Sequence, residues 1–151
     1  MNGAQLHLAL NHFPVILSIL SLAILLWGWL RKNSEIKKIG LCLVIVTAGF
    51  AATAYFTGDP AEDVLRNFPN FTKELVHEHE EAGEAAFIVS IIAGLVATLT
   101  MYIRRKGHRL SEVAFAIVII LTLMSSMAFF RTAHLGGLIH HEEIRPELPA
   151  H

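Results

Sequence analysis

The sequence predicts an all-α integral membrane protein, folded as an antiparallel four-helix bundle with both termini on the outer side. Of its 151 residues, 54% are hydrophobic, whereas soluble domains hold roughly 45–50% apolar residues with glycine included. Four apolar stretches without a charged residue approach the length of about 20 residues that a membrane span needs: residues 6–30, 39–57, 85–103 and 113–130. These stretches use most of the chain, so we expect a single domain over residues 1–151.

The four spans are expected at about residues 6–30, 39–57, 82–103 and 110–133. Short cytoplasmic loops of membrane proteins are enriched in lysine and arginine. The turns after the first and third spans hold eight of the twelve basic residues: Arg31, Lys32, Lys37, Lys38, Arg104, Arg105, Lys106 and Arg109. We therefore expect a multi-pass protein of the cytoplasmic (inner) membrane, with both termini on the periplasmic side.

Two features interrupt the first half of the chain. Pro14 lies within the first span, and a proline removes a backbone hydrogen bond and tends to kink a helix. After the second span, Asp59 followed by Pro60 is typical of an N-cap and a first helical residue. A short outer helix is therefore expected at about residues 60–67.

The second half predicts one overlong helix and a polar tail. With Thr72 as its N-cap, the third long helix continues beyond the thickness of a bilayer core, so its first turns should stand above the hydrocarbon. The fourth span runs out into Gly136-Gly137. The tail, residues 138–151, is polar and is expected to have little regular structure.

Histidine is concentrated at the predicted outer face. On the third span, His79 is in helical register with Gly83 and Ala86, a small-residue stripe that should face the bundle. His77 projects to another side, in register with Glu81. Eight of the nine histidines lie in the outer segments: His7, His12, His77, His79, His134, His140, His141 and His151.

Four of these histidines are candidate ligands, because three apolar helices bring them to one depth: His7, His12, His79 and His134. Ionisable groups in a membrane bundle usually face its interior and serve function, and imidazole is the commonest metal-ligating side chain. His77, Glu80 and Glu81 are weaker metal candidates, since His77 with its glutamates fits a charged exposed face better than a ligand set. The alternative for all of them is hydrogen bonding at the membrane interface.

Three short segments resemble a bacterial membrane family called domain of unknown function 2231. The stretch from His7 to Pro14, HLALNHFP, resembles its opening His-Pro-x-x-x-His-Phe-Pro, and Thr57-Gly58 follows the second span as in the family. A histidine, His79 with His77 as its rival, then begins the third span, and His134-Leu135-Gly136-Gly137 resembles the closing His-x-Gly-Gly. Leu8 stands where proline is usual, and His140-His141-Glu142-Glu143 replaces a glycine-rich close. Fusion of some relatives to Rieske-type iron–sulfur domains implies electron transfer.

These observations predict a haem b protein, similar to a cytochrome b, that transfers electrons at the outer face. Haem iron takes axial histidine, and Arg131 is a candidate partner for the haem propionates. One alternative is a zinc, copper or iron ion held by the same histidines with glutamate. A second is a cofactor-free accessory subunit of a larger membrane complex. Expected partners are the lipid bilayer, a redox protein or quinone, and further subunits or copies, but no nucleic acid.

Overall fold

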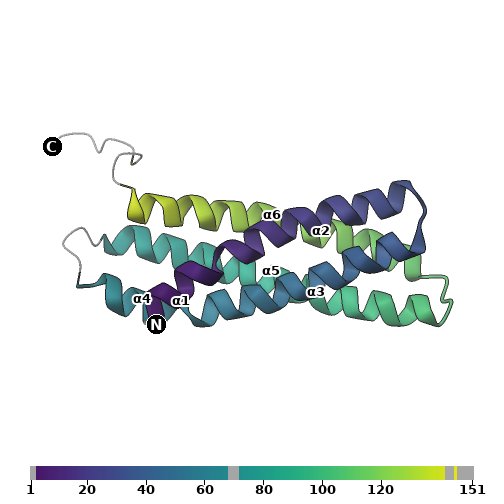
Figure 1. Cartoon of the computed structure of the whole chain (residues 1–151), viewed down its shortest axis with the longest axis horizontal. Coiled ribbons are helices and arrows are strands. Elements are labelled where there is room, and N and C mark those ends of the chain that lie inside the picture. Colours follow the sequence, from purple (N-terminus) through teal and green to yellow (C-terminus); the bar gives the residue numbers. More distant parts are fainter. Residues whose placement is uncertain (1–2, 68–71, 142–144, 146–151) are drawn as a thin grey trace.

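Helices make up nearly all of the computed structural model, which describes residues 3–67, 72–141 and 145. Four of them are long and lie side by side (Figure 1). The turns at residues 31–33 and 106–110 lie at one end, here called the basic end. The start of the chain and the close of the last helix lie at the other, here called the histidine end. In order the helices are α1 (Gly3–Leu10), α2 (His12–Leu30), α3 (Ser34–Phe56), α4 (Gly58–Leu65), α5 (Lys73–Arg105) and α6 (Ser111–His140).

The long helices form a closed antiparallel ring. Helix α2 packs against α3 and α6, and α5 packs against the same two helices from the other side. Small residues allow the close approach of α3 and α5, because a Cβ added to Gly94 would lie 2.7 Å from the Cβ of Ala48. This ring confirms the predicted all-α four-helix bundle.

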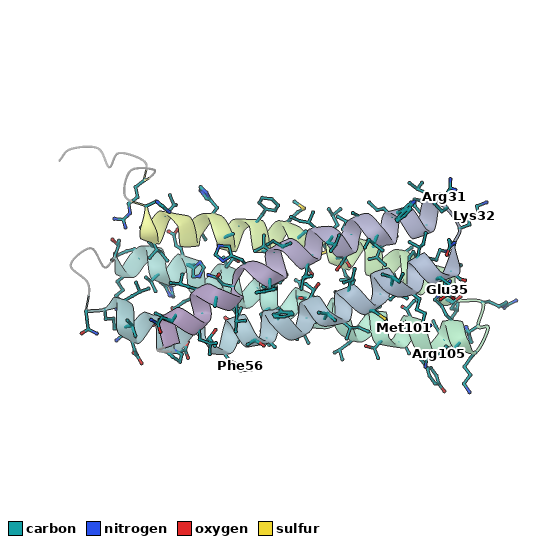
Figure 2. The ribbon with its side chains drawn as sticks, in the orientation of Figure 1. Arg31, Lys32, Glu35, Phe56, Met101 and Arg105 are labelled. Atoms are coloured by element: carbon teal, nitrogen blue, oxygen red, sulfur yellow. The ribbon has the colours of Figure 1, made fainter. Side chains whose placement is uncertain are left out.

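The outer surface of the bundle is apolar. Ile16 is 62% exposed, and Leu95 and Met127 are each 66% exposed. Four helical stretches are long and apolar enough to cross a membrane: Gly3–Leu30, Ser34–Leu65, Lys73–Arg105 and Ser111–Ile139. These are the features of a multi-pass membrane protein. In Figure 2, Arg31, Lys32 and Arg105 gather at the basic end, while Phe56 points outward near the other.

The first span is broken one turn before its proline. The break falls at Asn11, although the Asn11 N–H still donates to the His7 carbonyl at 2.9 Å. Pro14 is buried in α2 and has no N–H to donate to the Leu10 carbonyl. The predicted interruption is therefore present, and it separates His7 on α1 from His12 on α2.

The short helix begins earlier than predicted. Helix α4 spans Gly58–Leu65 rather than residues 60–67, and Thr57, not Asp59, occupies its N-cap. Pro60 is accommodated because the N–H groups of a first helical turn have no intrahelical partner. Helix α4 packs on α1, so the two short helices together cover the histidine end.

Helix α6 also departs from the prediction, because it continues through Gly136-Gly137 to His140. Leu135 and Leu138 are buried against Ala82 of α5, and this packing outweighs the low helix propensity of glycine. The Arg145 guanidinium donates to the carbonyls of Leu138 and Ile139 at 2.8 and 3.0 Å, which satisfies the C-terminal carbonyls of the helix. The remaining tail, 142–144 and 146–151, lies outside the described residues.

Candidate functional site

Two histidines from different helices meet at the histidine end. His7 on α1 and His79 on α5 are both half-buried, and their ring centroids lie 6.4 Å apart with the ring planes at 84°. His79 is thus the α5 histidine that faces the bundle, as its register with Gly83 and Ala86 predicts. His77 is 68% exposed and pairs with Glu81 at 3.4 Å.

Backbone carbonyls orient both rings. His7 Nδ1 lies 3.1 Å from the Ala54 carbonyl oxygen of α3 and 3.2 Å from the hydroxyl of Thr57. His79 Nδ1 lies 2.9 Å from the Thr132 carbonyl oxygen of α6. A carbonyl oxygen can only accept, so Nδ1 carries the proton in each ring. The Nε2 atom of each ring then holds the lone pair through which a neutral imidazole binds a metal.

The same arrangement surrounds histidines that ligate metals. Such histidines donate their second ring N–H to a carbonyl or carboxylate, which fixes the tautomer and makes the ligating nitrogen more basic. Here both carbonyls come from helices other than those that carry the rings. All four long elements of the bundle, with α1 extending α2, therefore contribute to the orientation of the pair.

Two further residues shape the site. A Cβ added to Gly136 would lie 3.1 Å from His79 Cε1, so the absence of a side chain there makes room for the imidazole. Asn11 follows His7 by one turn, and its Oδ1 is buried and has no hydrogen-bond partner among the described residues. Such an orphaned acceptor costs about 1–3 kcal/mol, and groups of this kind call for a functional or structural explanation.

The other candidate ligands are not brought to the pair. The side chains of His12, Arg131 and His134 are exposed. His12 follows the break at Asn11 and begins α2. On α6, Leu135 takes the inward position, which turns His134 outward. The expected convergence of four histidines is therefore not found in the described residues: only His7 and His79 come together.

The acidic candidates belong to a different cluster. The half-buried Glu80 carboxyl lies near Glu62 of α4, and Glu62 also pairs with Arg66 at 2.9 Å. Glu81 is 70% exposed beside His77. Across residues 3–67, 72–141 and 145, no group of three or more His, Cys, Asp or Glu is placed to hold a metal ion. The predicted histidine–glutamate metal site is thus not formed by these residues.

Sequence reasoning missed a buried cation at the basic end. Lys37, counted with the basic turn, is only 6% exposed, and its Nζ lies 2.6 Å from Glu112 Oε2. Glu112 also pairs with Arg104 at 2.6 Å. Glu112 is one of only two acidic residues near the basic turns, and that isolation is the signal that could have indicated the pair.

Comparisons with known proteins add no relative. No protein-family model, no curated protein and no solved structure matches the chain. The resemblance to the family named above therefore stays a prediction that rests on its short motifs.

Proposed function

We propose that this protein binds haem through His7 and His79 and carries electrons at the face of the membrane where its histidine end lies. The observation that supports this is the oriented pair: two imidazoles 6.4 Å apart, each held by an Nδ1 contact to a carbonyl of another helix. When bound, haem would supply one-electron chemistry.

The spacing and the number of donors suit haem. Imidazole nitrogens bind metals at about 2.0–2.1 Å, and the ring centroids of His7 and His79, 6.4 Å apart, are close enough for both rings to hold one metal centre. Haem iron needs only two axial ligands from the protein. A zinc site takes three or four, and the described residues offer no such group. Ligand number therefore favours haem over a bare zinc, copper or iron ion.

The chain's own residues would then have distinct tasks. His7 and His79 would hold the iron, and the carbonyls of Ala54 and Thr132 would keep each ring in its ligating tautomer. Asn11 Oδ1, buried and without a partner in the described structure, could accept a hydrogen bond from a water molecule held beside the bound group. These residues set ligand orientation and burial, the two factors by which a protein tunes haem.

The proposed function also requires a side of the membrane and an electron partner. Positive-inside reasoning places the basic end in the cytoplasm and the histidine end outside the inner membrane. A quinone in the bilayer or a redox protein at the outer face would exchange the electrons. Both the sidedness and the electron partner rest on charge distribution and on the family resemblance.

Absorption spectroscopy of the purified protein tests the proposal. After expression with haem supply, we expect bands that shift on reduction and about one iron per chain. His79→Ala should lose most of the bands, whereas His77→Ala, the matched change two residues away on an exposed ring, should keep them. If wild-type protein takes up neither haem nor metal when supplied with each, the proposal is wrong.

One observation favours a second candidate, a cofactor-free accessory subunit. The contacts of His7 with α3 and of His79 with α6 tie helices together, which is also what a purely structural histidine does. In that case His79→Ala should lower the free energy of unfolding by about 1–3 kcal/mol, and no haem or metal should bind to either form.

A further inference from the structure

A small cavity, lined by apolar groups and by several hydroxyl-bearing side chains, lies in the middle of the bundle. Its volume is about 10 Å³, close to the roughly 10–15 Å³ that one water molecule requires. The cavity is far from the histidine pair, because its lining residues fall near the middle of each candidate span. The hydroxyls that line it come from all four long helices: Ser18 of α2, Thr47 of α3, Ser90 of α5, and Thr122 and Ser125 of α6.

Four of these hydroxyls donate a hydrogen bond to a backbone carbonyl of their own helix. Ser18 donates to the Val15 carbonyl at 2.9 Å and Thr47 to the Leu43 carbonyl at 2.8 Å. The α6 hydroxyls act in the same way, with Thr122 donating to the Val118 carbonyl at 2.7 Å and Ser125 to the Leu121 carbonyl at 2.9 Å. Each hydroxyl oxygen keeps lone pairs, so these four groups can offer the cavity only acceptors.

Ser90 differs from the other four. Its side chain is only 2% exposed, yet the described residues provide no hydrogen-bond partner for its hydroxyl. Serine within a helix ordinarily donates to the carbonyl four residues earlier, as Ser125 does. The Ser90 hydroxyl can therefore donate a hydrogen bond into the cavity, whereas the other four hydroxyls can only accept one.

We propose that this cavity is a binding site for a single water molecule that links the four helices at mid-membrane. The water accepts a hydrogen bond from Ser90 and donates its two protons to two of the four hydroxyl oxygens. Buried water typically makes about three hydrogen bonds of this kind.

A cation is the competing occupant, because lone pairs attract positive charge. However, none of the described residues that line the cavity carries a carboxylate, and a charge at the centre of a bilayer without a counter-charge is costly. Water donates hydrogen bonds to the same acceptors and also accepts one from the Ser90 hydroxyl, which a cation cannot do. The polar lining thus favours the neutral ligand.

Water-edited solid-state NMR of the full chain in lipid bilayers tests this site. We expect magnetisation transfer from water to Thr122, well above that to Ala97, a fully buried residue outside the cavity. In Ser90→Ala the transfer should fall at least twofold, because the water loses its only donor. Thr98→Val, on the exposed face of the same helix, should leave it unchanged.

Three outcomes would overturn the proposal. The first is transfer to Thr122 no greater than to Ala97 in the wild type. The second is equal transfer in wild type and Ser90→Ala. The third is a thermal midpoint that rises when sodium replaces choline, which would indicate a cation. If Ser90→Ala fails to fold, Ala93→Val, which adds methyl groups to the cavity wall, should cause the same loss of transfer.

Discussion

The two ends of the bundle solve the problem of buried polar groups in opposite ways. At the basic end, Lys37 and Arg104 both pair with Glu112 at 2.6 Å, and both cations lie over the ring of Phe115. At the histidine end, the His7 and His79 rings contact backbone carbonyls, and Asn11 Oδ1 has no partner among the described residues. The basic end is thus satisfied within itself, whereas the histidine end keeps ligand-forming groups and one unmet acceptor.

The difference indicates a division of labour. Opposite charges close to one another form a stable contact at a modest net gain, provided that both partners are present. Neutral imidazoles cost less to bury than charged groups, and with Nδ1 on a carbonyl the ring binds a metal through Nε2. Stability is therefore expected to be most sensitive at the basic end, and ligand binding at the histidine end.

The largest effect on folding is expected from Glu112→Gln at the basic end. It leaves the buried Lys37 ammonium without a counter-charge, which should lower the free energy of unfolding by about 1–3 kcal/mol. The loss of free energy is limited to this range because the Glu112 side chain is 59% exposed and solvent screens its charge. Thermal unfolding in detergent measures the change. Glu35→Gln, an exposed acid at the same end, should stay within about 0.5 kcal/mol. Equal effects from both variants would remove the special role of the Lys37 pair.

A smaller, more selective effect is expected from Gly136→Ala at the histidine end. The added Cβ would press on His79 Cε1 at 3.1 Å, tilting the ring and weakening haem binding roughly tenfold, as loss of ligand support does in metal sites. Haem titration followed by absorbance gives the affinity. The control is Gly49→Ala, where an added Cβ meets nothing within 4 Å. Unchanged affinity in Gly136→Ala would mean that the ring position does not matter for binding.

The smallest effect, and one of opposite sign, is expected from Asn11→Leu. Removing a buried acceptor without a partner should raise the free energy of unfolding of the ligand-free protein by about 1 kcal/mol. Thermal unfolding again measures the change, with the exposed Asn67→Leu as control. A loss of stability in Asn11→Leu would show that the Asn11 oxygen has a partner in the folded protein.

Features of the fold that depend on local sequence could be predicted. Hydropathy gave the four helices, and helical register put His79 rather than His77 inside, because Ala86 and Ser90 share its face and are buried. Features that depend on distant packing could not. The double glycine at residues 136 and 137 was expected to end α6, but burial of Leu135 on α5 extends that helix.

The site was predictable only in part for the same reason. Depth in the membrane can be estimated from position in a span, so the histidines were correctly gathered at one end. The side of the bundle that a residue faces cannot be predicted across the break at Asn11, because helical register does not continue from α1 into α2. The sequence therefore groups His12 with His7 by depth alone. The carbonyls of Ala54 and Thr132 carry no sequence signal, because every residue has a carbonyl group and only the packing selects these two.

A double-mutant cycle on His7 and His79 tests the central claim, that these two rings hold one shared ligand, most directly. Haem affinity would be measured for the wild type, His7→Ala, His79→Ala and the double variant, with His77→Ala as control. A shared iron predicts that each single change costs at least tenfold and that the double change costs little more than either, a strongly non-additive result. Additive costs, or a single variant with wild-type affinity, would contradict a ligand shared by the pair.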